Sequence, residues 1–101
     1  MRPLELSAFV EADLDAIAAF IAEDNPIRAV TFIRAIRTKF RAIQHGPLIY
    51  QLRTDIGEDA RMATVGNYAI LFRIAGSAVR IERVVYAGRH LPGVFDVSSE
   101  P

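Results

Sequence analysis

The chain has 101 residues, enough for one small domain, and we expect a single domain over residues 1–101. It contains no cysteine and only two histidines, which lie far apart in the sequence. This composition excludes disulfide scaffolds and thiolate chemistry and argues against a histidine-based metal site. No apolar run approaches the roughly 20 residues of a membrane span, and acidic residues follow the N-terminus too soon for a secretory signal. We therefore expect a soluble cytoplasmic protein.

The formal net charge is zero, but acidic and basic residues are segregated along the chain. Residues 1–24 contain six acidic residues and one arginine, whereas residues 28–53 contain six basic residues and no acidic one. Eleven of the twelve basic residues are arginine, whose planar fork of donors suits carboxylate or phosphate groups. Hydrophobic residues make up 51% of the chain, which in so small a domain favours apolar surface for a partner to cover. The alternative is that this share is only slightly above the usual one and is inflated by alanine.

A short strand and a helix are predicted at the N-terminus. Leu4 and Leu6 alternate with a glutamate, which is typical of a brief strand over residues 2–6. Ser7 is a good helix cap, and acidic residues follow in the first turns, where the helix dipole favours them. Apolar residues then recur at i, i+3, i+4 and i+7 and predict a helix over about residues 8–23. Its apolar face is formed by Leu14, Ile17, Ala18 and Ile21 and widened by Phe20.

A second helix is predicted from Pro26 to about Gln44, with Asn25 as its cap. Because the link between the helices is so short, they must form an antiparallel hairpin. The apolar seam of the second helix comprises Ala29, Ile33, Ile36, Phe40 and Ile43. One exposed face carries three arginines spaced three and four residues apart, Arg34, Arg37 and Arg41.

After a predicted loop over residues 48–59, three strands are expected at residues 60–65, 68–74 and 78–86. Gly66-Asn67 and Gly76-Ser77 suit two-residue hairpin turns with glycine first. In the last strand, alternation places Val79, Ile81, Arg83 and Val85 on one face and Arg80, Glu82, Val84 and Tyr86 on the other. Neither face is purely apolar, which favours a central strand that is covered on both sides. The order of elements predicts an α+β fold, with an N-terminal strand and a helical hairpin packed on a small antiparallel sheet.

The residue pattern supports little catalytic chemistry. No acidic pair has metal-ligand spacing, no nucleophile motif or phosphate loop is present, and we expect neither a metal nor a cofactor. Metal-free RNA cleavage needs a base, an acid and cations on the scissile phosphate. The cations available are Arg61, Arg83 and Arg89, and the proton-transfer groups are Tyr86 and His90. The alternative is that Tyr86 is a packing residue and His90 an ordinary tail residue.

Two stretches resemble the ParE/RelE superfamily of type II toxin–antitoxin toxins, and the ParE branch most closely. ADLDAIAAFIAEDNP is similar to the family's first helix and its Asn-Pro break, and GNYAILFRIAGSAVRIERVVYAGRH to its sheet and tail. The residues that match are Tyr68, Arg73, Ile81, Arg83, Val84 and Arg89. Two positions depart from the pattern: Tyr86 stands where ParE-like tails usually carry histidine, and His90 stands where an acidic residue is common.

The resemblance implies a growth-inhibiting, plasmid-stabilising toxin that poisons DNA gyrase and blocks replication. It also implies a hetero-oligomer with a cognate ParD-like antitoxin, which neutralises the toxin. Gyrase poisoning requires no catalytic residue in the toxin, so we do not expect an enzyme. Two alternatives remain: a RelE-like ribosome-dependent mRNA endoribonuclease, or a non-toxic relic that only binds antitoxin.

The resemblance also suggests which residues meet each partner. Residues expected to bind the target are Arg61, Arg83, Arg89, His90, Leu91 and Phe95. Residues expected to bind the antitoxin are Leu14, Ile17, Ile21, Ile33, Arg34, Arg37 and Arg41. For the nuclease alternative, the catalytic residues would be Arg61, Arg83 and Tyr86.

Overall fold

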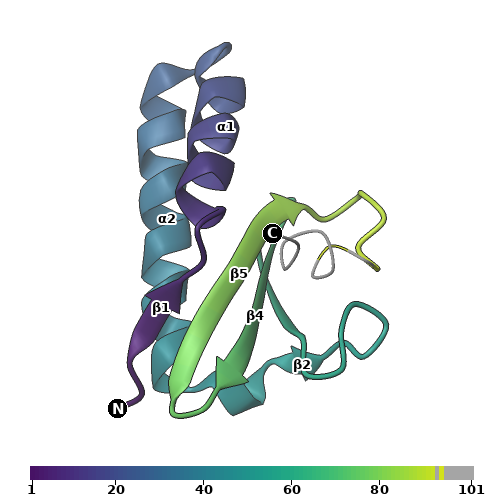
Figure 1. Ribbon diagram of the computed structural model, residues 1–101. Helices are drawn as coiled ribbons and strands as arrows, with labels where there is room; N and C mark the ends of the chain where they lie inside the picture. The colour runs from purple at the N-terminus through teal and green to yellow at the C-terminus, as the bar shows by residue number, and fades with distance from the viewer. Residues whose placement is uncertain (93, 95–101) are drawn as a thin grey trace.

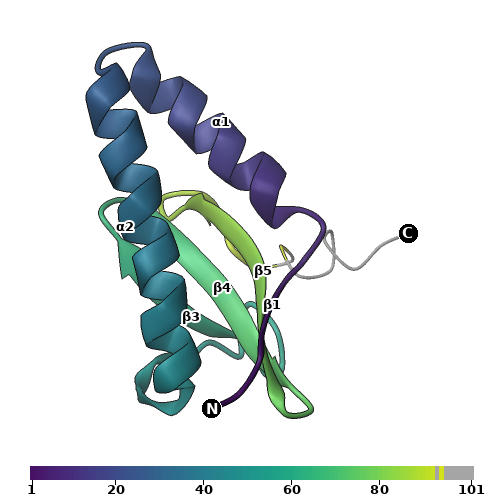
Figure 2. The same ribbon diagram turned by 90° about the vertical axis from the view of Figure 1, so that its left-hand side faces the viewer.

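The computed structural model describes residues 1–92 and residue 94, and these form two layers. Two helices lie side by side and cover one face of a five-stranded sheet (Figure 1, Figure 2). The strand order is β1-β5-β4-β3-β2, with β1 parallel to β5 and the other neighbours antiparallel. The elements are β1 (Leu4–Leu6), α1 (Val10–Ala22), α2 (Pro26–His45), η1 (Pro47–Ile49), β2 (Gln51–Leu52), β3 (Arg61–Val65), β4 (Tyr68–Ala75) and β5 (Ala78–Tyr86). The predicted α+β fold is confirmed.

The start of α1 differs from the prediction, because Ser7 is not its N-cap. The helix begins at Val10, and the residue before it, Phe9, makes no side-chain capping hydrogen bond. Ser7 is buried instead, and its hydroxyl donates a 2.6 Å hydrogen bond to the carbonyl oxygen of Glu82 on β5. The same hydroxyl accepts a 3.2 Å hydrogen bond from the amide of Phe9. A long-range partner therefore replaces the local capping role that the sequence predicted.

The helical hairpin follows the prediction at its turn. Asn25 is the N-cap of α2, and its side-chain oxygen accepts a 3.0 Å hydrogen bond from the amide of Arg28. Pro26 occupies the first turn, where its missing N–H would have no helical acceptor. The helix ends at His45, one residue beyond the predicted end.

The two predicted hairpin turns are confirmed in the sheet. Gly66 and Gly76 have φ angles of 56° and 63°, which a glycine at the first turn position adopts without steric cost. The predicted loop over residues 48–59 contains η1 and the two-residue strand β2, which sequence analysis missed. Two residues are too few to show an alternating pattern, so β2 becomes visible only through its pairing with β3.

A β-bulge in β5 corrects the predicted strand faces. Leu71 pairs with Arg83, but its neighbour Phe72 pairs with Ile81, so one extra residue is inserted in β5. Val84 therefore joins Ile81 in the core beneath the helices, while Val85 joins a smaller apolar cluster that also contains Leu71. Simple alternation had placed Val84 and Ile81 on opposite faces. The prediction that β5 is covered on both sides is confirmed.

Candidate functional site

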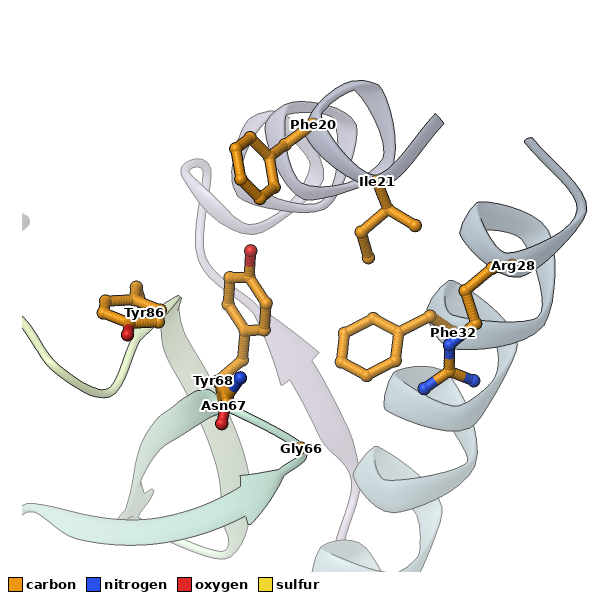
Figure 3. Close-up of a pocket in the computed structure, with 8 residues that line it drawn as sticks. All are labelled: Phe20, Ile21, Arg28, Phe32, Gly66, Asn67, Tyr68 and Tyr86. Atoms are coloured by element: carbon orange, nitrogen blue, oxygen red, sulfur yellow. The ribbon is translucent and has the colours of Figure 1, made fainter. Parts of the chain in front are cut away.

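An apolar groove of about 720 Å³ opens between the end of the helical hairpin and the β3–β4 turn. The end of α1 and the first turns of α2 form one wall, and the turn and the adjoining ends of β4 and β5 form the other (Figure 3). The lining residues are Phe20, Ile21, Arg28, Phe32, Gly66, Asn67, Tyr68 and Tyr86. Apolar grooves of this size are where proteins commonly bind a ligand or a partner.

Three aromatic rings form a row along this groove. The ring centroids of Phe32 and Tyr68 are 5.6 Å apart, and those of Tyr68 and Tyr86 are 6.0 Å apart with a T-shaped geometry. Phe20 faces the two tyrosines from α1 and is 67% exposed, and Tyr86 is 55% exposed (Figure 3). Large rings that are held in place yet open to solvent suit recognition of apolar side chains on a partner.

Arg28 is the charged residue that lines the groove. Its guanidinium carbon lies 5.0 Å from the centroid of the Phe32 ring, which orients the cation over an aromatic face. Among the residues that the structure describes, no acidic side chain pairs with it. Ile27 and Val30 are also exposed on the first turns of α2, but their helical positions place them away from the side that carries Phe32. An apolar partner segment with a carboxylate would therefore fit both the rings and the cation.

The predicted antitoxin-binding residues lie in four different environments. Ile21 lines the groove. Leu14 and Ile17 are only 2% and 5% exposed, because they form part of the core between the helices and the sheet. Ile33 is partly buried against that core. The remaining residues are exposed on α2, namely Arg34, Arg37 and Arg41.

Arg37 and Glu11 form a bridge across the helical hairpin. Both oxygens of the Glu11 carboxylate accept hydrogen bonds from the guanidinium, at 2.8 and 3.2 Å. These hydrogen bonds lower the pKa of Glu11 and raise the pKa of Arg37. Neither Arg34 nor Arg41 has an acidic partner among the described residues. Two of the three arginines on this face are therefore open to an acidic partner.

The predicted target-binding residues are in different environments. Arg61 donates a 2.8 Å hydrogen bond to the carbonyl oxygen of Tyr50 and thereby helps to hold the segment before β2. Arg89 and His90 are exposed just after β5, whereas Leu91 is buried in the smaller apolar cluster. The remaining residues of this set are Arg83, which pairs with an acidic side chain of α1, and Phe95, which lies outside the described residues.

Arg83 is held by Asp13. Its Nε and Nη2 atoms donate hydrogen bonds of 2.9 Å each to the two carboxylate oxygens, and the side chains are only 15% and 11% exposed. These hydrogen bonds raise the pKa of Arg83. The guanidinium also lies 5.3 Å from the centroid of the Phe9 ring. The charge of Arg83 is therefore neutralised within the fold.

The three residues of the nuclease alternative do not converge. Arg61 lies opposite Phe72 of β4, whereas Tyr86 lies opposite Tyr68. Phe72 and Tyr68 are four residues apart on β4, which corresponds to roughly 13 Å along the strand. Arg61 and Tyr86 are also on different strands, because β4 lies between β3 and β5. Because Arg83 is already neutralised by Asp13, no pair of free cations among the described residues flanks Tyr86 in the way that the predicted chemistry requires.

Other kinds of site find no support in the described part of the chain. Within residues 1–92 and 94, no three histidine or acidic side chains are grouped closely enough to hold a metal ion. Neither α1 nor α2 is long and apolar enough to cross a membrane.

Most of the groove is not evident from the sequence. The apolar pattern of α1 predicts Phe20 only as part of a widened core face, and no sequence pattern marks Arg28, Phe32 or Tyr68 as site residues. One signal was present: Phe20 lies off the i, i+3, i+4, i+7 pattern of α1, so an aromatic ring there is exposed unless a partner covers it.

Comparisons with known proteins agree with this fold. The family model described as "ParE toxin of type II toxin-antitoxin system, parDE" matches residues 4–91. Among solved structures, the chain is similar to one titled "Chromosomal ParDE TA system from P. aeruginosa", with a TM-score of 0.74 and 22% sequence identity, covering 85% of this chain and 96% of that chain. A search of curated proteins finds no match. Because the family model spans most of its length, the chain belongs to the ParE toxin family of type II toxin–antitoxin systems.

Proposed function

We propose that this chain is a ParE-like toxin that binds DNA gyrase, stalls it and blocks replication. The observation that carries the proposal is the family match over residues 4–91, which covers α1, α2 and the strands β1 to β5. Arg61 lies apart from Tyr86, and Arg83, although it lines the same small pocket as Tyr86, is neutralised by Asp13. This favours a binding toxin over a nuclease, because metal-free RNA cleavage needs its free cations on one phosphate. We also propose that residues 1–101 act as one domain in the cytoplasm, where gyrase works.

Family membership implies an antitoxin partner, and we propose that a ParD-like antitoxin neutralises the toxin by occupying the aromatic groove. Its binding segment would be an amphipathic helix or strand that places apolar side chains on the rings and a carboxylate on Arg28. The antitoxin chain would then continue around α2 to bring carboxylates to its exposed arginines, which lie on the other side of that helix from Phe32. The proposed surface comprises Phe20, Ile21, Arg28, Phe32, Tyr68, Tyr86, Ile33, Arg34, Arg37 and Arg41. Leu14 and Ile17 support it from the core.

For the target, we propose a surface at the end of β5 that includes Arg89 and His90. Both are exposed, and Arg89 lines a pocket of about 250 Å³ that shares Tyr68 and Tyr86 with the groove. Because the two surfaces share these tyrosines, an antitoxin seated in the groove would also obstruct the target. This arrangement supports neutralisation by direct competition. Arg61 lies apart from this surface, with its side chain engaged by Tyr50.

The decisive experiment is tightly induced expression of the chain alone, with DNA synthesis and translation followed over the first minutes. Gyrase poisoning predicts an early fall in DNA synthesis and a DNA-damage response while mRNA and translation remain intact. Purified gyrase incubated with the toxin should then accumulate cleaved DNA. Early translation arrest with cut mRNA would instead establish the endoribonuclease alternative. Antitoxin binding without any effect on growth would identify a non-toxic relic.

A further inference from the structure

The bulge in β5 is secured by side chains from the N-terminal part of the chain. The extra residue inserted opposite β4 lies between Ile81 and Arg83, at Glu82. The carbonyl oxygen of Glu82 accepts the 2.6 Å hydrogen bond from the Ser7 hydroxyl. Two residues further on, the amide of Val84 donates a 3.0 Å hydrogen bond to Oδ2 of Asp13. Backbone groups at the bulge and just after it thus have side-chain partners that no regular strand would supply.

Asp13 connects this bulge to helix α1. Its carboxylate accepts three hydrogen bonds, two from the Arg83 guanidinium and one from the Val84 amide. Charge-assisted, bidentate contacts in a largely buried setting are strong and geometrically restrictive. The position of α1 and the shape of the bulge are therefore coupled through one side chain.

The bulge decides which face of the sheet carries Tyr86. Side chains alternate along a regular strand, so without an extra residue Ile81 and Tyr86 would point to opposite faces. With the bulge, Val84 lies in the same core as Ile81, and Tyr86 lies beside Tyr68 in the groove (Figure 3). The aromatic row in the groove exists only in this register.

We propose that Asp13, assisted by Ser7, is a positioning residue for the antitoxin groove: it holds the β5 bulge and thereby keeps the Tyr86 ring on the helix-covered face. The role of the groove in binding antitoxin rests on the proposed function. The positioning of Tyr86 does not, because it concerns contacts within this chain. Arg83, which the resemblance marks as a target-binding residue, thus acts with Asp13 from inside the fold.

The test is solution NMR of the full chain, with ring-to-ring nuclear Overhauser contacts as the readout. In the wild type, Tyr68 contacts both Phe32 and Tyr86. In the Asp13→Asn, Ser7→Ala double variant we expect the contact between Tyr68 and Tyr86 to be lost and the one with Phe32 to persist. Glu11→Gln removes another bidentate carboxylate–arginine contact from α1 and should change neither contact. A Tyr68–Tyr86 contact that persists in the double variant overturns the proposal.

Two further measurements keep the test decisive. If the double variant does not fold, Asp13→Asn alone should speed hydrogen exchange at the Val84 amide about tenfold relative to Glu11→Gln, and an unchanged rate overturns the proposal. The probe for binding is the ParD-like antitoxin of the same toxin–antitoxin system. In the otherwise wild-type toxin, Asp13→Asn should weaken binding of this probe about tenfold. In a toxin that already carries Tyr86→Ala, the same substitution should have little effect on binding, because the ring that Asp13 positions is absent. If Tyr86→Ala itself leaves the affinity unchanged, the groove assignment fails, while the NMR result still decides the positioning role.

Discussion

The ring of Phe32 on α2 lies against Gly66 in the β3–β4 turn, so closely that a Cβ atom at position 66 would come within 3.1 Å of the ring carbon Cε1. Gly66 also has a φ of 56°, which side chains other than glycine rarely adopt. Two independent constraints therefore require glycine here. The positive φ is required by the β3–β4 turn, and the lack of a side chain is required by the Phe32 ring in the wall of the groove.

Substitution of the two turn glycines separates these constraints. Gly76 has a similar φ of 63° but open space around its α-carbon. We expect Gly76→Ala to cost about 1 kcal/mol of unfolding free energy from backbone strain alone. Gly66→Ala should cost about 1–2 kcal/mol more, because the Phe32 ring must also move. Urea unfolding of both variants measures the difference, and equal losses would show that the Phe32 contact is not tight.

Gly88 has a corresponding role for Tyr86. A Cβ atom at position 88 would overlap the Tyr86 ring, so Gly88→Ala should displace that ring from the groove. Because the ring is half exposed and can swing into solvent, stability should change little. We expect antitoxin affinity to fall about tenfold, as for loss of an aromatic anchor. Gly46→Ala, which adds a methyl group in open space, is the matched control and should leave affinity unchanged.

The two arginine–carboxylate bridges from α1 should differ in their effect on stability. Arg83→Ala leaves the largely buried Asp13 carboxylate without its ionic partner and should cost about 3 kcal/mol. Arg37→Ala removes an exposed bridge of similar geometry and should cost less than about 1 kcal/mol. Urea unfolding at neutral pH gives both values. Similar losses of unfolding free energy in the two variants would mean that the Asp13 carboxylate becomes hydrated when Arg83 is removed, and that this hydration compensates for the missing ion pair.

The Glu11–Arg37 bridge also predicts a small acid-sensitive contribution to stability. Its hydrogen bonds hold the pKa of Glu11 below the ordinary value in the folded state. A carboxylate whose pKa is lowered in the folded state stabilises the fold at pH values above its unfolded-state pKa of about 4.3. This contribution is lost as the pH falls through the folded-state pKa. Glu11→Gln should therefore be slightly less stable than the wild type at pH 7 and should lose less stability between pH 5 and 3. Because both side chains are exposed, high salt should shrink the difference.

The periodic elements of this fold were predictable because their signals are local. The helical hairpin follows from its apolar spacing and the Asn25-Pro26 break, and the two hairpin turns follow from glycines at their first positions. The bulge in β5 was not predictable, since its stabilising partners, Ser7 and Asp13, lie about seventy residues away in the sequence. The groove was missed for the same reason, because it joins residues from four separate elements.

The arginines of the chain predict two surfaces that can be tested against each other. Arg89 and His90 are exposed beyond β5, whereas Arg34 and Arg41 are exposed on α2. A variant with Arg89→Glu and His90→Ala should lose toxicity yet still be captured by the antitoxin, because its groove and the exposed arginines of α2 are unchanged. A variant with Arg34→Ala and Arg41→Ala should stay toxic and bind the antitoxin roughly fivefold more weakly, as expected for charges at an interface rim.

Growth inhibition and antitoxin affinity, measured for both double variants, decide between these surfaces. Circular dichroism should first show that each variant folds, which is expected because none of the four side chains contributes to the core. Arg61 is left out of the comparison, since its hydrogen bond to Tyr50 would mix a change in fold with a change in charge. The opposite result would be loss of toxicity in the Arg34→Ala, Arg41→Ala variant and loss of antitoxin binding in the Arg89→Glu, His90→Ala variant. In that case the assignments of the target-binding and antitoxin-binding surfaces would have to be exchanged. The basic face of α2 would then be the part of the toxin that meets gyrase.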